Sequence, residues 1–525
     1  MTISAGDQRG LVLGALLLAA FAVNVDTTIV NVTLPTLVRQ LHASDSQLQW
    51  VVDAFNLVFA GAVLAAGSLS DRFGRKGMLL GGLAVFGLAS LAGGLMDTPG
   101  ELIAARAVMG VGAAMVFPST LSLLTAAFTE RKERALAIGL WGATTGMAIA
   151  LGPIIGGGLI QIFDWRSVFF VMTPIALLAG GLVLAFVASS RDPRARRSDL
   201  LGFVLSTAMV ALLVFTIIEA PNHGWGGPRT LMSFVAVAVL LGLFIIWERR
   251  VEEPMLDVSL FVNLRFTAAS VSVAISFFAL SGFIFLVTQY FQFLKGYGPL
   301  SSGVRLLPVA MSVAVSSIVG TKLAVRIGTK LVVTAGLLLT TAFYAWVTTA
   351  SPTTTYLTIA LQMVVMGTGM GLTSAPATEA IMGVVPRAKA GVGSAVNDAT
   401  RLTGGTLGVA IIGSVYASLF SNRLSGRQPT QLPAPLAHAT HSSIGAALDV
   451  AASLAHSGHA ALATAVRVTA TDAFMHGIHG GEWLAAGISL IGAALAFALL
   501  PAHPVTSTPA ELDPADRVLP SPAGN

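Results

Sequence analysis

The sequence predicts an all-α polytopic membrane protein with 14 transmembrane helices. Hydrophobic residues make up 54% of the 525 residues and charged residues only 10%, whereas soluble domains carry about 25% charged residues. A soluble protein of this length cannot bury so much apolar surface, which excludes a large soluble enzyme. The apolar runs are also long enough to cross a bilayer as helices, because one crossing needs about 20 residues.

The predicted spans follow one another closely, except before the last one. Their expected limits are 11–34, 48–69, 77–96, 100–126, 135–161, 167–188, 200–219, 230–247, 267–294, 299–320, 331–350, 355–384, 391–419 and 483–501. An even number of crossings places both termini on the same side of the membrane.

The positive charges indicate which side this is. Of the 30 lysine and arginine residues, 20 fall in the loops and tails on the side of the termini, eight on the other side and two within spans. Cytoplasmic loops carry the excess of basic residues. We therefore expect a cell (inner, cytoplasmic) membrane protein with both termini in the cytoplasm, and the net charge of +5 does not indicate nucleic-acid binding.

A weak internal repeat links the two halves of the chain. "GSLSDRFGRKG" follows the second predicted span and "GTKLAVRIGTK" follows the tenth, with an offset of 254 residues from Arg72 to Arg326. Many transporters build alternating access from repeated halves. The alternative interpretation is two unrelated basic loops.

The longest connection, 421–481, is expected on the outer side as a short helical excursion. It contains six of the nine histidines, which are His438, His441, His456, His459, His476 and His479. No cysteine occurs in the chain and no carboxylate pattern completes a ligand set. We therefore predict no metal site and no cofactor.

The sequence also lacks the means to hydrolyse ATP by a phosphate-binding loop. Such loops require a Gly-Lys step, and none of the six lysines follows a glycine. No HExxH or GxSxG motif is present either, so we predict that the protein is not an enzyme. Active transport by this chain must use an ion gradient or a separate partner.

The loop "GSLSDRFGRKG" resembles the signature loop of the major facilitator superfamily. The matching residues are Gly67, Asp71, Arg72, Gly74, Arg75 and Lys76. The resemblance implies that the aspartate engages a neighbouring helix end and that the basic residues latch the inner gate. A carboxylate at a helix N-terminus gains about 0.3–1 kcal/mol, which suits a latch that must reopen. The second copy has Val325 in place of the acid, and a plain topogenic loop is the alternative.

The fifth predicted span, "GATTGMAIALGPIIGGG", is rich in glycine. The residues in question are Gly142, Gly146, Gly152, Pro153, Gly156 and Gly157. Small residues four apart allow close helix contact, and a Gly-Pro step bends the helix. The spacing resembles the antiporter motif of drug exporters, which favours export over uptake. Ordinary helix packing is the alternative interpretation.

The segments 165–177, 290–308 and 362–414 are similar to the fourteen-helix drug:proton antiporters of this superfamily. The resemblance covers roughly residues 10–420 and 471–501. The resemblance implies the major facilitator fold, with two six-helix bundles plus two extra central helices. The expected parts are an N-terminal six-helix bundle at 1–190, a linker with the two extra helices at 191–266, a C-terminal six-helix bundle at 267–501 with the excursion 421–481, and a disordered cytoplasmic tail at 502–525.

Three charged residues within the outer half of the first bundle are candidates for proton coupling. Asp26 and Asp53 lie about eight and five residues from the outer ends of their helices, which is roughly 7–12 Å deep. If they share a cavity, burial and mutual repulsion favour protonated carboxyl groups near neutral pH. The resemblance includes Asp26 directly and implies that Arg106 tunes a nearby carboxylate. The alternatives are an interfacial Asp53 and an Arg106 that snorkels to the outer surface.

A second charged group lies in the second half, at Glu379, Asp398 and Arg401. Asp398 and Arg401 are three residues apart and can neutralise one another on one helix face, so a structural pair and a second proton site both remain open. Glu379 is either interfacial or helps to bind a cation.

These features predict a proton-coupled secondary active exporter of amphipathic, cationic or neutral, drugs or toxic organic compounds. Its expected partners are protons, small amphipathic substrates and membrane lipid, with the chain acting as a monomer. The alternatives are an exporter of a lipid or envelope precursor, for which the excursion would act as a guide, and a proton-coupled metabolite importer of the same fold. No motif supports a membrane-embedded enzyme or a sensor.

Overall fold

The computed structural model describes residues 5–128, 130–190, 199–252, 258–384, 390–429 and 431–501. Within these ranges every regular element is helical and no strand occurs. The predicted all-α class is therefore confirmed. The tail predicted at 502–525 lies outside the described residues, as do the side chain of Asp71 and the surroundings of Gly146.

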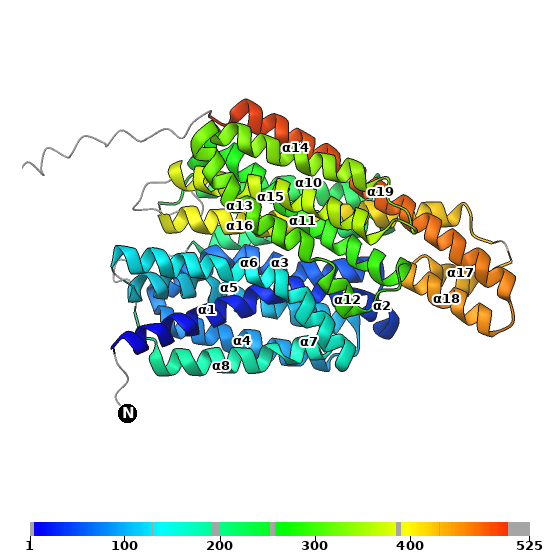
Figure 1. The fold of residues 1–525 in the computed structure, drawn as a ribbon, viewed down its shortest axis with the longest axis horizontal. Helices are drawn as coiled ribbons and strands as arrows, with labels where there is room; N and C mark the ends of the chain where they lie inside the picture. The colour runs from blue at the N-terminus through cyan, green and yellow to red at the C-terminus, as the bar shows by residue number, and fades with distance from the viewer. Residues whose placement is uncertain are drawn as a thin grey trace, which may run out of the picture.

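The first half of the chain forms one bundle, drawn from blue to cyan in Figure 1. Its elements are α1 (Ala5–Ile29), η1 (Val30–Thr33), α2 (Leu34–Leu41), α3 (Asp45–Phe73), α4 (Arg75–Leu95), α5 (Pro99–Ala127), α6 (Arg131–Ile162), α7 (Ser167–Phe170) and α8 (Met172–Phe186). Capping boxes at Ser44 and Thr98 begin α3 and α5, because each cap side chain and the N3 side chain satisfy free backbone N–H groups reciprocally.

The second half forms the other bundle, and two central helices lie against both. The central pair is α9 (Leu200–His223) and α10 (Pro228–Glu248). The second bundle contains η2 (Val258–Val262), α11 (Leu264–Gln289), η3 (Tyr290–Leu294), α12 (Pro299–Val304), α13 (Leu307–Ile327), α14 (Thr329–Val347), α15 (Tyr356–Val384), α16 (Ala390–Ser425), α17 (Ala434–Thr440), α18 (Ile444–His456) and α19 (Ala460–Leu499). Helix α9 packs against α3 of one bundle and α16 of the other, and α10 packs against α9.

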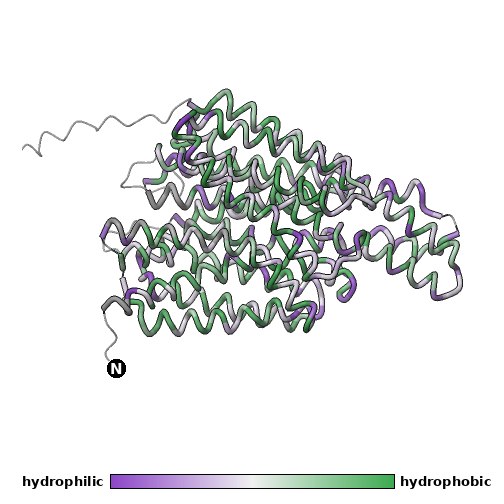
Figure 2. Tube along the Cα trace, viewed as in Figure 1, coloured by the Kyte–Doolittle hydropathy of each residue, from purple (hydrophilic) through white to green (hydrophobic). Residues whose placement is uncertain are grey.

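The long helices are those that the sequence predicts as spans. Among the described residues, 12 helical segments are long and apolar enough to cross a membrane. Helices α3 and α6, with 29 and 32 residues, are not among these 12 segments, although they cover the predicted spans 48–69 and 135–161. Hydrophobic residues run along the lengths of these helices, and hydrophilic residues gather near the ends of the molecule (Figure 2).

Helices α17 and α18, with the first part of α19, project beyond one end of the molecule, which we call the excursion end (Figure 1). The helix predicted at 483–501 begins much earlier, at Ala460, and has 40 residues. At 1.5 Å per residue it is about 60 Å long, roughly twice the apolar thickness of a bilayer. Arg423 and Arg427 at the end of α16 both donate to Asp472 of α19, at 2.9 Å each, and thereby fix the projecting part.

The two repeated loops share a backbone feature at the expected offset. Gly74 between α3 and α4 has φ +112°, and Gly328 between α13 and α14 has φ +93°. These positions are again 254 residues apart. Glycine reaches such φ values without steric cost, whereas other residues rarely do. The shared conformation supports a repeat rather than two unrelated basic loops.

We predict that Gly74→Ala lowers the free energy of unfolding by about 1–2 kcal/mol, because alanine at this φ is strained. A Cβ at Gly74 would meet no atom within 4 Å, so the loss would come from the backbone alone. The matched control is Gly77→Ala, which is equally open but lies within helix α4. Thermal unfolding in detergent checks this, and equal midpoints for the two variants would contradict it.

Candidate functional site

Asp26 and Arg106 form a buried ion pair inside the first bundle. Arg106 Nη1 donates to Asp26 Oδ2, and the two side chains are 0% and 1% exposed. Arg106 Nε also donates to the carbonyl oxygen of Val51 at 2.9 Å, and the guanidinium lies 4.4 Å from the ring centre of Phe55. The arginine therefore joins α1, α3 and α5 in the interior and does not snorkel to the surface.

Glycine in α5 allows this arrangement. Gly110 lies one turn after Arg106, and a Cβ there would lie 2.6 Å from the carbonyl oxygen of Phe55. A Cβ at Gly112 would likewise lie 2.6 Å from the backbone nitrogen of Phe86 in α4. Small residues let helix backbones approach closely in membranes. The approach of α5 to α3 is what brings Arg106 within reach of the Val51 carbonyl.

Asp53 lies on a different face of α3 from the ion pair. Its side chain is fully buried, and neither carboxylate oxygen has a hydrogen-bond partner among the described residues. One turn before it, Gln49 accepts a hydrogen bond from Ser414 of α16 at 3.3 Å. One turn after it, Leu57 packs against α9 and α16. Asp53 thus faces the central helices and the second bundle. Val51, whose carbonyl oxygen binds Arg106, lies on the opposite side of α3, because positions two apart point to opposite sides of a helix.

A cavity of about 120 Å³ lies between the two bundles. The uncharged polar residues of this central cavity are Asn24, Thr27, Thr28, Asn31, Asn56 and Ser281, and its aromatic residues are Phe59, Phe117 and Phe277. Neither Asp26 nor Asp53 is among the lining residues, so the structure does not place the two acids in one cavity. The polar residues of α1 occupy a helix face next to the one that carries Asp26.

This polar face was not among the predicted site residues, although the sequence contains a signal for it. Asn24, Thr27, Thr28 and Asn31 recur at intervals of three and four residues, which places them on one side of a helix. Polar side chains in that pattern within an apolar run indicate a helix that faces a cavity rather than lipid.

The structure brings together only two of the three residues of the second charged group. Asp398 and Arg401 both line the central cavity, with a separation of 3.7 Å between their charged atoms. The Arg401 guanidinium also lies 4.6 Å from the ring centre of Phe277. Glu379 is exposed on α15 and does not line this cavity. The structure therefore separates Glu379 from the other two.

The signature loop is tied to the end of α8. Lys76 Nζ donates to the carbonyl oxygen of Leu184 at 3.0 Å, and the backbone N–H of Arg75 donates to the carbonyl oxygen of Ser190 at 2.9 Å. Arg72 is exposed and lies over the ring of Phe73. These contacts fix the loop within the first bundle at the end of the molecule opposite the excursion (Figure 1).

The glycine-rich helix α6 connects α1 to the second bundle. Thr28 of α1 donates to the carbonyl oxygen of Ala148 at 3.1 Å. A Cβ at Gly156 would lie 2.9 Å from Val32 of η1. A Cβ at Gly157 would instead lie 2.5 Å from the Cα atom of Leu300, in α12 of the second bundle. Adjacent glycines thus face opposite partners.

Several other contacts join the two bundles at the excursion end. Gln292 of η3 donates to the carbonyl oxygen of Val32 in η1 at 3.0 Å. Arg39 of α2 lies 5.4 Å from the ring centre of Phe293. Helix α18 packs on α2. Burial there raises the pKa of Asp449 above its ordinary value, and the nearby Arg39 and His42 offset only part of this effect. The excursion thus covers a junction that includes the continuation of α1.

Comparison with known proteins identifies the family. A family model described as Major Facilitator Superfamily matches residues 16–409. The chain belongs to the major facilitator superfamily. Solved structures also match. One is a bacterial homologue of the human lysosomal transporter Spinster in its inward-facing, unoccupied form, with a TM-score of 0.67 at 16% identity, over 95% of this chain and 99% of that one. A D-xylose–proton symporter has a TM-score of 0.56 at 13% identity, over 94% and 98%. These likenesses agree with the superfamily fold.

Superfamily members with known roles match at higher identity. Multidrug resistance protein Stp of Mycobacterium tuberculosis is 35% identical, over 80% of this chain and 78% of the relative. Multidrug efflux pump LfrA of Mycolicibacterium smegmatis is 32% identical, over 84% and 87%. Methyl viologen resistance protein SmvA of Salmonella typhimurium is 34% identical, over 85% and 90%. The chain is thus a multi-pass membrane protein similar to efflux proteins of this superfamily.

Proposed function

We propose that the protein is a proton-coupled exporter of amphipathic organic compounds, cationic or neutral, and that it works as a monomer in the cell membrane with both termini in the cytoplasm. Its relatives are named for multidrug and methyl viologen resistance. The observation that carries the proposal is the buried ion pair between Asp26 and Arg106, one helix face away from a cavity between the bundles. A charge pair in this position is expensive to maintain and marks an ion pathway.

Asp26 is the proposed proton carrier. A proton on its carboxyl group removes the negative charge that holds Arg106, so the attraction between α1 and α5 is lost. Arg106 remains bound to the Val51 carbonyl and stacked on Phe55. Protonation therefore loosens α1 from α3 and α5, while Val52 and Asn56 of α3 line the central cavity. In this way, protonation of Asp26 changes the packing of a helix that lines the substrate cavity.

Protonation of Asp26 also affects the contacts that join the two bundles at the excursion end, because α1 leads into them. Asp26 lies one turn before η1, and η1 bonds to Gln292 of the second bundle. Helix α6 touches α1 on one side and α12 on the other. A shift of α1 thus alters both contacts that close the excursion end. Once this end is open, a proton that binds from outside releases the substrate and permits the return to the inward-facing state, and proton loss inside restores the ion pair.

The central cavity favours amphipathic compounds. Phe59, Phe117 and Phe277 offer apolar and π surfaces, and the asparagine and threonine side chains of α1 offer hydrogen bonds. Asp398 supplies a negative group, which Arg401 partly neutralises. A cation can compete for Asp398, since aromatic faces also attract cations. We assign Asp398 and Arg401 to substrate binding and Asp53 to the junction with α9 and α16.

Each part of the chain has a proposed role in this cycle. The N-terminal bundle 1–190 carries the proton site, the linker 191–266 adds the central pair, and the C-terminal bundle 267–501 completes the cavity. The loop at Arg75 and Lys76 latches the inner gate. The substrate crosses the membrane chemically unchanged in this cycle, so the proposed activity is transport rather than the conversion of a substrate.

The test is a resistance and efflux assay in a bacterial host that lacks its own exporters. Cells that express the chain should survive higher concentrations of methyl viologen and of a neutral amphipathic drug, and should accumulate less of each. Dissipating the proton gradient should erase the difference. Equal accumulation with and without the chain, at verified membrane levels, would contradict export of these compounds. Altered lipid composition without altered drug accumulation would favour the lipid exporter instead.

A further inference from the structure

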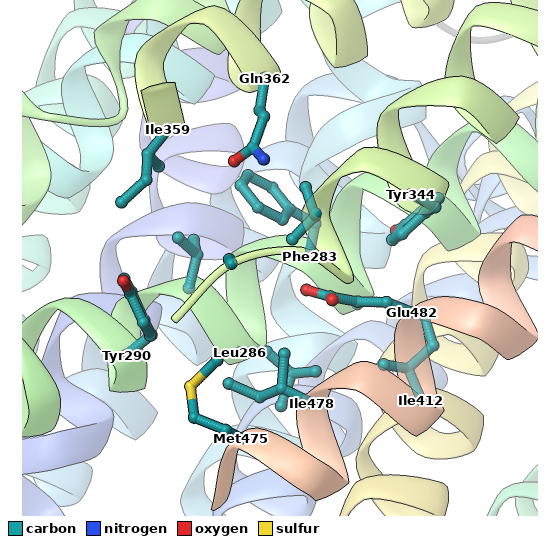
Figure 3. Close-up of a pocket in the computed structure, with 14 residues that line it drawn as sticks. Phe283, Leu286, Tyr290, Tyr344, Ile359, Gln362, Ile412, Met475, Ile478 and Glu482 are labelled. Carbon is teal, nitrogen blue, oxygen red and sulfur yellow. The ribbon is translucent and has the colours of Figure 1, made fainter. Parts of the chain in front are cut away.

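The second bundle encloses a separate small cavity that contains a carboxyl group. The cavity has a volume of about 30 Å³ and lies between α11, α14, α15, α16 and α19. Its lining is mostly apolar, with Tyr290, Tyr344, Gln362 and Glu482 as the polar exceptions. Figure 3 shows the carboxyl group of Glu482 pointing from α19 into the space beside Phe283.

One carboxylate oxygen of Glu482 lacks a hydrogen-bond partner among the described residues. The side chain is 5% exposed, and its Oε2 atom accepts no hydrogen bond from any described residue. The other polar groups are already committed to backbone carbonyl oxygens. Tyr290 donates to Ser351 at 2.7 Å, Tyr344 donates to Ala279 at 2.5 Å and Gln362 donates to Trp346 at 3.3 Å. The lining therefore offers acceptor oxygens and aromatic faces, but no lysine or arginine.

Such a site suits a proton better than any other ligand. A carboxylate that is buried without a cation or donor is costly, and a bound proton removes that cost. One water molecule needs roughly 10–15 Å³ by the same kind of measure, so the cavity has room for water beside the carboxyl group. An organic cation of drug size does not fit. The absence of a lysine or arginine from the lining disfavours an anion.

The cavity lies near the excursion end, from which a proton can arrive. Glu482 is 17 residues before the end of α19, about 25 Å along a helix, in a bilayer whose apolar core is about 30 Å thick. One turn before it, Nε2 of the half-buried His479 lies 2.9 Å from the carbonyl oxygen of Ala350, which lines the cavity. His479 is thus a titratable group of α19 that lies beside the cavity on the excursion side of Glu482.

The remaining charged and titratable groups around the cavity are few. Tyr290 and Tyr344 face it from η3 and α14, and α11, α15 and α16 contribute no titratable lining residue. Lys295 lies 5.7 Å from the ring centre of Tyr290, with its ammonium group donating to the loop carbonyls of Pro352 and Thr354. The lysine is therefore committed to the loop and leaves Glu482 unpaired.

We propose that Glu482 is a second proton-binding site, separate from Asp26 and Arg106, that takes up its proton from the excursion side beside His479. The proposal rests on proton-coupled export and adds one proton per cycle in the second bundle. Asp26 and Glu482 then place one proton carrier in each half of the fold.

The first test measures protonation directly and needs no transport. Infrared difference spectra of the purified full chain between acidic and alkaline pH should contain a carboxyl signal that disappears in Glu482→Gln and shifts in Glu482→Asp. The matched control, Glu252→Gln at an exposed position, should retain it. Identical spectra of wild type and Glu482→Gln would overturn the proposal, and Glu482→Asp provides the comparison if Glu482→Gln does not fold.

The second test measures the number of coupled protons. In proteoliposomes with an imposed pH gradient and no membrane potential, each coupled proton multiplies the substrate ratio by about ten per pH unit. Glu482→Gln should therefore still transport, with the ratio reduced about tenfold per pH unit. An unchanged ratio would overturn the second site. Loss of binding of an amphipathic cation in Glu482→Gln would also overturn it, by placing Glu482 in the substrate site. Absence of any proton-driven transport by wild type would refute export itself, whatever the infrared result.

Discussion

Asp26→Asn is expected to abolish proton-driven export while the protein still inserts into the membrane. Asparagine cannot take up and release a proton, so the ion pair with Arg106 can neither form nor break during the cycle. The variant also leaves the buried Arg106 charge uncompensated, which costs about 3–5 kcal/mol. Everted membrane vesicles that are energised by respiration should therefore accumulate no more substrate with this variant than without the protein.

Two further variants separate coupling from stability. Asp97→Asn removes an acid that is 84% exposed and pairs with Arg166 at the surface, so it should retain export. The double variant Asp26→Asn with Arg106→Gln removes both buried charges and should regain thermal stability without regaining transport. Proton-driven export by Asp26→Asn at normal membrane levels would refute the assignment of Asp26.

Gly157→Ala is expected to prevent closure of the excursion end. Its Cβ would lie 2.5 Å from Leu300 Cα and 2.6 Å from the carbonyl oxygen of Pro299, and both are backbone atoms that cannot turn aside. Overpacking of this kind costs about 1–3 kcal/mol, which shifts a two-state population about 5- to 150-fold. Transport should fall by a similar factor, with the molecule held open at the excursion end.

The neighbouring glycine provides the control for this prediction. A Cβ at Gly158 would lie 3.9 Å from the Leu300 side chain, an ordinary contact, so Gly158→Ala should transport normally. Because the chain contains no cysteine, Asn31→Cys can report access to the central cavity without background. A membrane-impermeant maleimide should label it faster from the excursion side in Gly157→Ala than in Gly158→Ala. Equal labelling would show that α6 and α12 do not form the gate.

The fold could be predicted from the sequence because the bilayer constrains it strongly. Apolar length, the balance of basic residues and the two loops around Arg72 and Arg326 are local properties, and each is visible in one stretch of chain. The start of the last helix was missed because residues 460–482 are alanine-rich with scattered polar residues. Helix propensity, reinforced by the pairing of Asp472 with two arginines, extends α19 far beyond the apolar run.

The candidate site was harder to predict, since it depends on which helix faces meet. Asp26 and Arg106 were each visible as charges in apolar runs, but their pairing required α5 to approach α1 and α3. The expected partnership of Asp26 with Asp53 is not what the structure brings together, because the rotation of α3 directs Asp53 towards α9 and α16. Glu482 was not predicted as a site residue because it lies between the predicted excursion, 421–481, and the predicted last span, 483–501.

The most direct test of the account follows protons and substrate together in proteoliposomes of the wild-type chain. The substrate is given a concentration gradient, no proton gradient is imposed, and a trapped pH dye reports the lumen. Coupled exchange predicts that substrate moving in one direction drives protons in the other, and that Asp26→Asn shows no such proton movement. Substrate flux without proton flux, or with protons moving in the same direction, would contradict proton-coupled export.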